Sequence, residues 1–212
     1  MNTQNQKRGA LGVRSQLRQK IGRGFDDPVH DAHATFRAIM TALAEPGKVR
    51  VTPSPADAPA ALSPAMTAIA LALTDFETPV WCDAGPEVEA YIGFHTGAPM
   101  ALSPSAAAFA LITRPERAPR LSAFAAGSLD FPDRSTTIVV AIDDIATDAG
   151  WYLTGPGVAS ARRLLVAPLG ESMRTEILAN RARFPCGLDF LFCRDATVVG
   201  LPRSTHIDQK VD

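Results

Sequence analysis

Residues 136–142 read Thr136-Thr137-Ile138-Val139-Val140-Ala141-Ile142, a run dominated by β-branched side chains. Such side chains favour the extended backbone of a strand, so we predict a strand here, the clearest one in the sequence. A second strand is predicted at residues 151–154, and we expect it to pair with the first across the connection at residues 143–150.

Short apolar runs on either side of this stretch predict further strands. These are expected at residues 48–52, 79–82 and 108–113. Residues 190–194 and 197–200 are predicted to form a C-terminal hairpin that turns at Asp195-Ala196.

Helix signals alternate with these strands. Asp31 is predicted to cap a helix at residues 31–45, which Pro46-Gly47 ends. Ser63-Pro64 is predicted to begin a second helix that runs to residue 73. Shorter helical pieces are predicted at residues 86–94, 121–126 and 171–183. Because helices and strands interleave along the whole chain, we expect an α/β layer structure with a mixed sheet.

Composition narrows the class of protein. The 212 residues are 46% hydrophobic and 20% charged, enough to bury a core without a disulfide or a metal. The formal net charge of -1 gives no general attraction to nucleic acid or anionic lipid, and no apolar run reaches the roughly 20 residues of a membrane helix. Cys82, Cys186 and Cys193 form no closely spaced pair, which favours a reducing cytoplasm and excludes familiar zinc or iron–sulfur spacings.

One globular domain is expected at residues 24–205, between a basic arm at residues 1–23 and a tail at residues 206–212. The arm contains six basic residues and no acid, and we expect it to be poorly ordered. Two roles stay open for it. The arm either docks on an acidic partner surface or a nucleotide, or it is a solvated tail.

The best local candidate for contact with an anion is Asp133-Arg134-Ser135-Thr136-Thr137. The Arg134 guanidinium can grip a phosphate or phosphonate with two hydrogen bonds, and the Ser135 and Thr136 hydroxyls add donors. The alternative is a turn with an Asp133–Arg134 ion pair just before a strand begins. A charged hydrogen bond contributes only about 1.5–3 kcal/mol, so Arg134 alone would not hold a triphosphate.

Two other motifs are candidates for ligand contact. His95 and Thr96 either place an imidazole at a ligand or subunit surface, or complete the core or a helix end. Thr154-Gly155-Pro156-Gly157 bends the backbone and either exposes amides to a phosphate or forms a plain turn, since it matches no known nucleotide-binding loop. His30 and His33 on a predicted helix provide only a weak metal motif.

A set of short motifs extends over most of the expected domain. They are Gly24-Phe25-Asp26-Asp27-Pro28-Val29, Phe36-Arg37-Ala38-Ile39-Met40, Pro46-Gly47, Leu73-Thr74-Asp75, Thr78-Pro79-Val80-Trp81, Phe94-His95-Thr96-Gly97-Ala98, Phe131-Pro132-Asp133-Arg134-Ser135-Thr136-Thr137, Leu153-Thr154-Gly155-Pro156-Gly157, Phe184-Pro185-Cys186-Gly187-Leu188-Asp189 and Leu201-Pro202-Arg203-Ser204-Thr205. In this order, the set resembles the H subunit family of the bacterial carbon–phosphorus lyase core complex. The basic arm lies outside the resemblance.

The resemblance implies a fold, a set of partners and a reaction. It implies a three-layer αβα structure with a mixed sheet, a reduced version of the pyridoxal-phosphate-dependent transferase fold, and a homodimer. It also implies an assembly with G, I and J subunits that handles alkylphosphonates such as methylphosphonate. There the G, H and I subunits with the L protein exchange the adenine of ATP for the phosphonate, giving ribose 1-phosphonate 5-triphosphate. A radical subunit with an iron–sulfur cluster later cleaves the carbon–phosphorus bond.

The residues present argue against a complete reaction centre in this chain. It has four lysines against 17 arginines, and three of those lysines lie in the expected tails, so we expect no pyridoxal phosphate. The cysteine spacing likewise predicts no iron–sulfur cluster. We favour an accessory subunit that organises the complex. The alternatives are a self-contained transferase, with Arg134 as anion clamp and His95 as acid or base, and a ligand-sensing module.

Overall fold

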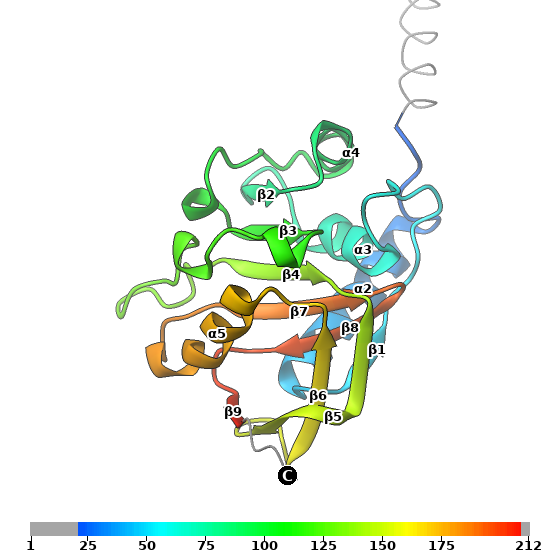
Figure 1. Cartoon of the computed structure of the whole chain (residues 1–212). Helices are drawn as coiled ribbons and strands as arrows, with labels where there is room; N and C mark the ends of the chain where they lie inside the picture. Colours follow the sequence, from blue (N-terminus) through cyan, green and yellow to red (C-terminus); the bar gives the residue numbers. More distant parts are fainter. Residues whose placement is uncertain (1–20, 209–212) are drawn as a thin grey trace, which may run out of the picture.

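The computed structural model describes residues 21–208, and a six-stranded mixed sheet with the order β1-β8-β7-β4-β3-β2 runs through its middle (Figure 1). The parallel strands are β2 (Val80–Cys82), β3 (Phe109–Ile112), β4 (Thr137–Ala141) and β7 (Asp189–Arg194). The antiparallel strands are β8 (Thr197–Leu201), which pairs with β7, and β1 (Val49–Val51), which pairs with β8. The predicted α/β class and the predicted mixed sheet are confirmed.

The strand predicted at residues 136–142 is β4, in the interior of this sheet. Ile138, Val139 and Val140 have no exposed area, because β4 is covered on both faces and paired along both edges. The predicted C-terminal hairpin is also confirmed as β7 and β8. Asp195 has a φ of 50° in its turn, a left-handed conformation that aspartate tolerates better than most residues.

The prediction that residues 151–154 pair with this strand is wrong. They belong to β5 (Asp144–Thr154), which forms a second, three-stranded sheet between β6 (Arg162–Ala167) and β9 (His206–Asp208). Because β3 and β7 occupy both edges of β4, no edge is left there for β5. No strand was predicted at β6, and β9 lies where a tail was expected to begin. Residues 209–212 lie outside the described part of the chain, as do residues 1–20 of the expected arm.

Four of the five predicted helices are present with small differences at their ends, whereas the piece predicted at residues 121–126 is only a short 3₁₀ turn. The four helices are α2 (Pro28–Ala44), α3 (Pro64–Leu73), α4 (Pro86–Thr96) and α5 (Glu171–Asn180). Short 3₁₀ turns lie at η1 (Pro104–Ala106), η2 (Pro115–Arg117), η3 (Leu121–Ala123) and η4 (Arg181–Arg183). None of the helices in residues 21–208 combines the length and the apolar composition needed to cross a membrane.

The cap of α2 differs from the prediction. Asp27, not Asp31, is the N-cap, and its Oδ1 accepts hydrogen bonds from the backbone N–H groups of Val29 and His30 at 3.2 and 3.1 Å. Pro28 then occupies the first helical position, where its missing N–H costs nothing. Asp31 instead accepts from the backbone N–H of Asp27 at 3.1 Å. Two carboxylates therefore secure the first turn, and the helix starts earlier than predicted.

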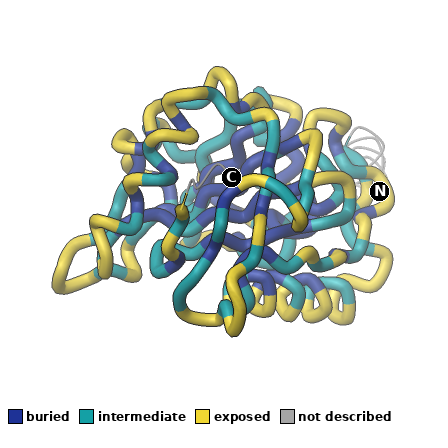
Figure 2. The backbone as a smooth tube through the Cα atoms, turned by 60° about the horizontal axis from the view of Figure 1, so that its bottom comes forward, coloured by how far each residue is buried: buried dark blue, intermediate teal, exposed yellow. Residues whose placement is uncertain are grey.

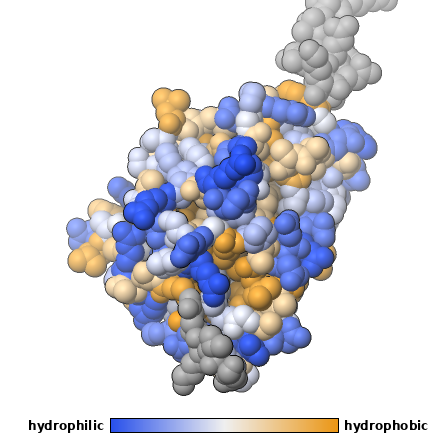
Figure 3. Space-filling model, in the orientation of Figure 1, coloured by the Kyte–Doolittle hydropathy of each residue, from blue (hydrophilic) through white to orange (hydrophobic). Residues whose placement is uncertain are grey.

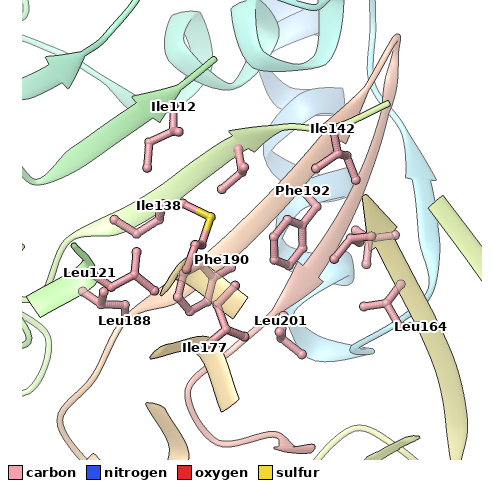
Figure 4. Packing of buried hydrophobic residues seen from close by; sticks show 14 of the residues in the cluster. Ile112, Leu121, Ile138, Ile142, Leu164, Ile177, Leu188, Phe190, Phe192 and Leu201 are labelled. Carbon is pink, nitrogen blue, oxygen red and sulfur yellow. The ribbon is translucent and has the colours of Figure 1, made fainter. Parts of the chain in front are cut away.

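Two hydrophobic cores lie on opposite faces of the large sheet. On one face, α2, α3 and α4 cover Val139, Leu191 and their neighbours. On the other face, Phe190 and Phe192 pack against α5 and the three-stranded sheet, as Figure 4 shows for part of the cluster. In Figure 1, α5 and β6 lie in front of the sheet and α2 lies behind it. The expected αβα layering is therefore correct for one side, while the other outer layer combines a helix with a small sheet.

Candidate functional site

Arg203 joins three of the sequence motifs. It follows β8, and its Nε lies 3.1 and 3.2 Å from the two carboxylate oxygens of Asp189, the first residue of β7. Its Nη1 donates to the Pro132 carbonyl at 2.6 Å. Its Nη2 donates to Asp189 Oδ2 at 2.5 Å and to Ser135 Oγ. Segments near residues 132, 189 and 203 are thereby held by one guanidinium.

The ion pair between Arg203 and Asp189 is shielded from water. The two side chains are 14% and 22% exposed, and the backbone N–H of Arg203 adds a hydrogen bond to Asp189 at 2.8 Å. Most of the donors of Arg203 are therefore used inside the protein. Its arrangement suits a structural clamp better than the capture of a free anion, because a ligand would have to displace these short contacts.

The clamp secures the loop at residues 127–135. Within it, the N–H of Ser128 donates to the carbonyl of Phe131 at 3.2 Å, and the N–H of Phe131 donates to Ser128 Oγ at 3.1 Å. Gly127 has a φ of 74°, and a Cβ there would lie 2.7 Å from the Pro132 carbonyl oxygen. Only glycine combines a positive φ with the absence of a Cβ. The loop projects on the left of Figure 1.

Two phenylalanines with stacked arginines lie on and beside this loop. Phe131 is 48% exposed, with the Arg134 guanidinium 4.2 Å from its ring centre. Phe184 is 50% exposed, with the Arg181 guanidinium 4.5 Å from its ring centre. The N–H of Gly187 donates to the Ala126 carbonyl at 2.8 Å, so the two segments adjoin. Figure 3 shows apolar surface at the tip of the loop. Arginine and aromatic side chains of this kind are enriched in protein–protein interfaces.

The three residues predicted to bind an anion here have different environments. Arg134 is exposed, and among the described residues it forms no ion pair with Asp133, so the alternative prediction of a turn ion pair is wrong. Ser135 accepts a hydrogen bond from Arg203. Thr136 is fully buried, and its Oγ1 donates to the Ala107 carbonyl at 2.7 Å. Of the three side chains, that of Arg134 is the one open to a ligand in solution.

His95 lies at the end of α4, against the segment that enters the domain. Its Nε2 is 2.9 Å from the Gly22 carbonyl, and its ring packs 4.5 Å from that of Tyr91. The Tyr91 hydroxyl donates to the Arg23 carbonyl at 3.0 Å, and burial raises the pKa of Tyr91 to about 12, so it stays a donor at neutral pH. Next to His95, Thr96 Oγ1 donates to the Ile92 carbonyl at 2.8 Å and accepts from the N–H of Ala98. Thr96 thus completes a helix end.

The entering segment is also bonded to the loop before α3. The Nε of Arg23 donates to Asp57 at 2.8 Å, and this hydrogen bond lowers the pKa of the Asp57 carboxyl. A Cβ on Gly22 would lie 2.2 Å from the Asp57 carbonyl oxygen. Residues 21–23, assigned to the basic arm from the sequence, are therefore packed on the domain. A hollow of about 520 Å³ lies beside them, lined by Phe25, Leu71, Phe94 and His95 among others.

The turn Thr154-Gly155-Pro156-Gly157 packs against the end of α2. A Cβ on Gly157 would lie 2.0 Å from the Ala44 carbonyl oxygen, and Gly157 has a φ of 77°. Nearby, the Nη1 of Arg162 donates to the Pro46 carbonyl at 2.8 Å. The close approach of two backbones accounts for the glycine at position 157, in accord with the plain turn that the sequence left open.

These candidate residues do not form one site. The 127–135 loop, α4 and the turn after β5 lie at the left, top and bottom of Figure 1. No three His, Cys, Asp or Glu side chains within residues 21–208 come together in a way that would hold a metal ion. His30, for its part, lies 2.8 Å from the Asp27 carboxylate.

Sequence reasoning missed the role of Arg203 and Asp189. Both lie in the quoted motifs, and a signal was available. Asp189 immediately precedes Phe190, Arg203 closely follows Leu201, and Phe190 and Leu201 pair at the open end of the hairpin. An acid and a base that flank a predicted hairpin in this way are brought together by its register.

Comparisons with known proteins agree on one relationship. A family model described as bacterial phosphonate metabolism protein (PhnH) matches residues 23–208. The chain is 35% identical over 191 residues to the alpha-D-ribose 1-methylphosphonate 5-triphosphate synthase subunit PhnH of Rhizobium meliloti (strain 1021), covering 88% of this chain and 94% of that protein. It is 29% identical over 178 residues to the "Putative C-P lyase subunit protein HtxG" of Stutzerimonas stutzeri, covering 82% and 85% respectively.

Proposed function

Because this chain belongs to the PhnH family of bacterial phosphonate metabolism proteins, we propose that it is a subunit of an assembly that converts an alkylphosphonate and ATP to ribose 1-phosphonate 5-triphosphate. Methylphosphonate is the expected example, and the carbon–phosphorus bond is cleaved in a later step. The observation that carries the proposal is the match to a synthase subunit over 94% of that protein's length. The family match at residues 23–208 includes both sheets, so the likeness is not confined to one motif.

The proposed role is positioning rather than catalysis by this chain alone. A self-contained transferase would use Arg134 and His95 together, but they belong to the 127–135 loop and to α4, which lie in separate parts of the molecule (Figure 1). We expect G, I and J subunits as partners and a second copy in a homodimer, with no nucleic acid or membrane partner. Exposed phenylalanines with stacked arginines, as at Phe131 and Phe184, support a role in protein contacts.

A contribution of Arg134 to an anion-binding wall is the finer part of the proposal. Its guanidinium is exposed and held over the ring of Phe131, on a loop that Arg203 clamps. A preorganised arginine of this kind binds phosphonate or phosphate at a smaller entropic cost than a mobile one. Other subunits would have to supply the remaining charges, since a single arginine contact contributes only about 1.5–3 kcal/mol.

The proposal assigns no pyridoxal phosphate and no iron–sulfur cluster to this chain. Within residues 21–208 the only lysine is Lys48, and its Nζ lies 2.6 Å from Glu45 in an ion pair. Descent from the pyridoxal-phosphate-dependent transferase fold, with the cofactor site lost, is part of the proposal and is supported by the parallel strands β2, β3, β4 and β7. The three free cysteines support placement in a reducing cytoplasm.

The test is co-expression of the tagged chain with G, I and J subunits, followed by capture and an assay of adenine release. ATP, methylphosphonate and the L protein are supplied, and the purified chain is assayed alone in parallel. We expect a stable complex whose adenine release requires this chain, and no release by the chain alone. A chain that stays apart from the co-expressed subunits, or that converts substrate unaided, would contradict the proposal.

Arg134→Ala tests the anion-binding wall, with Arg117→Ala at another exposed arginine as the matched control. Loss of adenine release from an intact complex, with Arg117→Ala active, supports contact of Arg134 with the ligand. Unchanged adenine release by Arg134→Ala would contradict the anion-binding role. Loss of the complex itself would instead assign Arg134 a role in assembly.

A further inference from the structure

Large apolar side chains lie on the solvent-facing side of α2. Val29 is 75% exposed, Phe36 is 48% exposed and Met40 is 53% exposed. Another side of the helix packs on the domain through Thr35, Ile39 and Ala42, which are buried. In Figure 2, α2 lies along the lower edge, and the side of the helix that faces outward is exposed while the side that faces the domain is buried. The exposed apolar residues are therefore not part of either core.

These residues form a continuous stripe along the helix. Positions 29, 33, 36 and 40 follow each other at intervals of four, three and four, which places them on one side of an α-helix. We call Val29, His33, Phe36 and Met40 the outer stripe of α2. At 1.5 Å per residue it is roughly 16 Å long. This narrow stripe, apolar at three of its four positions, has the period and shape that pack against a second helix.

One side of the outer stripe carries an unpaired positive charge. Arg37 lies there, beside His30, and forms no ion pair with any residue in the described part of the chain. The nearest carboxylate to His30 belongs to Asp27, which caps the helix and contacts the His30 ring at 2.8 Å. Asp31 is turned toward the Asp27 N–H. The stripe thus presents an unpaired cation next to Phe36.

This charge pattern discriminates between possible occupants. In a two-fold dimer built on the stripe, the same surface would contact itself, so the side of one helix that carries Arg37 would face the side of the other that carries Arg37. Like charges at an interface oppose association. A different chain with carboxylates beside its apolar residues would instead pair with Arg37 and satisfy it.

We propose that the outer stripe of α2 binds an amphipathic helix of another subunit, whose apolar ridge contacts Phe36 and Met40 and whose bordering carboxylate pairs with Arg37. The inference rests on the proposed function, because the partner is expected among the G, I and J subunits. It is independent of the Phe131–Phe184 region, which lies on other elements.

The first test removes the apolar contacts. Phe36→Ala combined with Met40→Ala is expected to weaken association with the co-expressed subunits about thirtyfold or more, the effect of losing a central aromatic contact in an interface. The matched control is Phe76→Ala, which removes a phenylalanine that is 73% exposed on the loop after α3. It should bind as the native chain does. Because the truncated side chains are exposed, circular dichroism and the melting temperature of the isolated variants should change little.

The second test concerns the charge and the identity of the occupant. Arg37→Glu should weaken association about tenfold and remove part of its salt dependence, while Arg117→Glu should not. A photo-crosslinking residue at position 36 should form its adduct within a helix of another subunit that carries acidic residues beside apolar ones. An adduct on a second copy of this chain, or native binding by the Phe36→Ala, Met40→Ala variant, would overturn the inference. If the native chain binds no subunit at all, the proposed function fails first.

Discussion

At Arg203, one side chain decides the position of a whole loop. Its guanidinium contacts Asp189, Ser135 and the Pro132 carbonyl, and the pair with Asp189 is mostly shielded from water. A shielded ion pair adds little stability compared with an apolar pair of the same shape, but the loss of one partner leaves a charge without compensation. The contribution of Arg203 is therefore best seen when one partner is removed at a time.

Arg203→Ala is predicted to destabilise the protein by about 3–5 kcal/mol, because Asp189 is left shielded and unpaired. Urea unfolding checks this, with the midpoint expected to fall at an unchanged slope. The double variant Arg203→Ala, Asp189→Asn serves as the control and should be less destabilised than the sum of the two single variants. Additive losses would mean that the two side chains do not act as a pair.

The cysteines allow a prediction about pH. Burial raises the pKa of the Cys82 thiol from its usual 9.0 to about 11 and raises that of the fully buried Cys193 as well. Because the thiolate is the reactive form, alkylation of native Cys82 should be slow at pH 8 and accelerate as the pH approaches 11. Mass spectrometry of iodoacetamide-treated protein measures this, with the half-buried Cys186 as the internal comparison. Rapid labelling of Cys82 at pH 8 would contradict it.

The same shift has a consequence for stability. A thiol with a raised pKa in the folded state stays protonated there while the unfolded chain already ionises. The stabilisation by buried Cys82 is therefore fully present below about pH 9 and is lost as the pH rises toward 11. The free energy of unfolding, measured between these values, should decline more in the native protein than in Cys82→Ala.

At the scale of elements, the glycine turn after β5 and the end of α2 fit together through their backbones. Gly157 approaches the Ala44 carbonyl so closely that no Cβ has room, and Arg162 adds a hydrogen bond to the Pro46 carbonyl. The three-stranded sheet is thereby joined to the helical layer on the far side of the large sheet. Two motifs that are distant in the sequence are explained by this single contact.

Gly157→Ala is predicted to lower the melting temperature by several degrees, because the added methyl group must displace the Ala44 carbonyl as well as adopt a positive φ. Gly85→Ala is the matched control. Gly85 also has a positive φ, of 91°, but a Cβ there would meet nothing within 4 Å. The fall in melting temperature of Gly85→Ala should reflect backbone strain alone. Equal falls in the two variants would show that the contact of Gly157 with α2 contributes nothing.

At the scale of the whole molecule, the two cores make the centre of the large sheet its most protected part. β3 and β4 are covered on both faces and paired on both edges, whereas β1 lies at the edge of the large sheet and β9 at the edge of the small one. Local opening requires the least free energy where few buried contacts are lost. The layered arrangement therefore predicts a graded resistance to opening.

Native-state hydrogen exchange should show this gradient. Amides of Ile138, Val139 and Val140 are expected to exchange only through global unfolding, and those of β1 and β9 through local opening. Peptide-resolved mass spectrometry at increasing urea concentrations separates the two regimes. Exchange in β4 as fast as in residues 206–208 would contradict the proposed layering.

The amino-acid sequence by itself determined most of the elements and their order. A β-branched run predicted β4 and short apolar runs predicted its parallel neighbours. Ser63-Pro64 predicted the start of α3, and the ordered motifs predicted the PhnH family. These are local properties, because strand propensity, caps and turns depend on residues close together in the chain. These local properties did not predict which of the candidate ligand-binding residues lie close together.

Only the tertiary structure decided which strands share a sheet and which side chains meet. β5 had the composition to pair with β4, but both edges of β4 were taken by strands that come from distant parts of the chain. Arg134 and Ser135 are adjacent in sequence, yet Ser135 bonds to Arg203 while Arg134 stacks on Phe131. Such outcomes depend on competition between distant segments for the same edge, surface or donor, and that competition has no local signature.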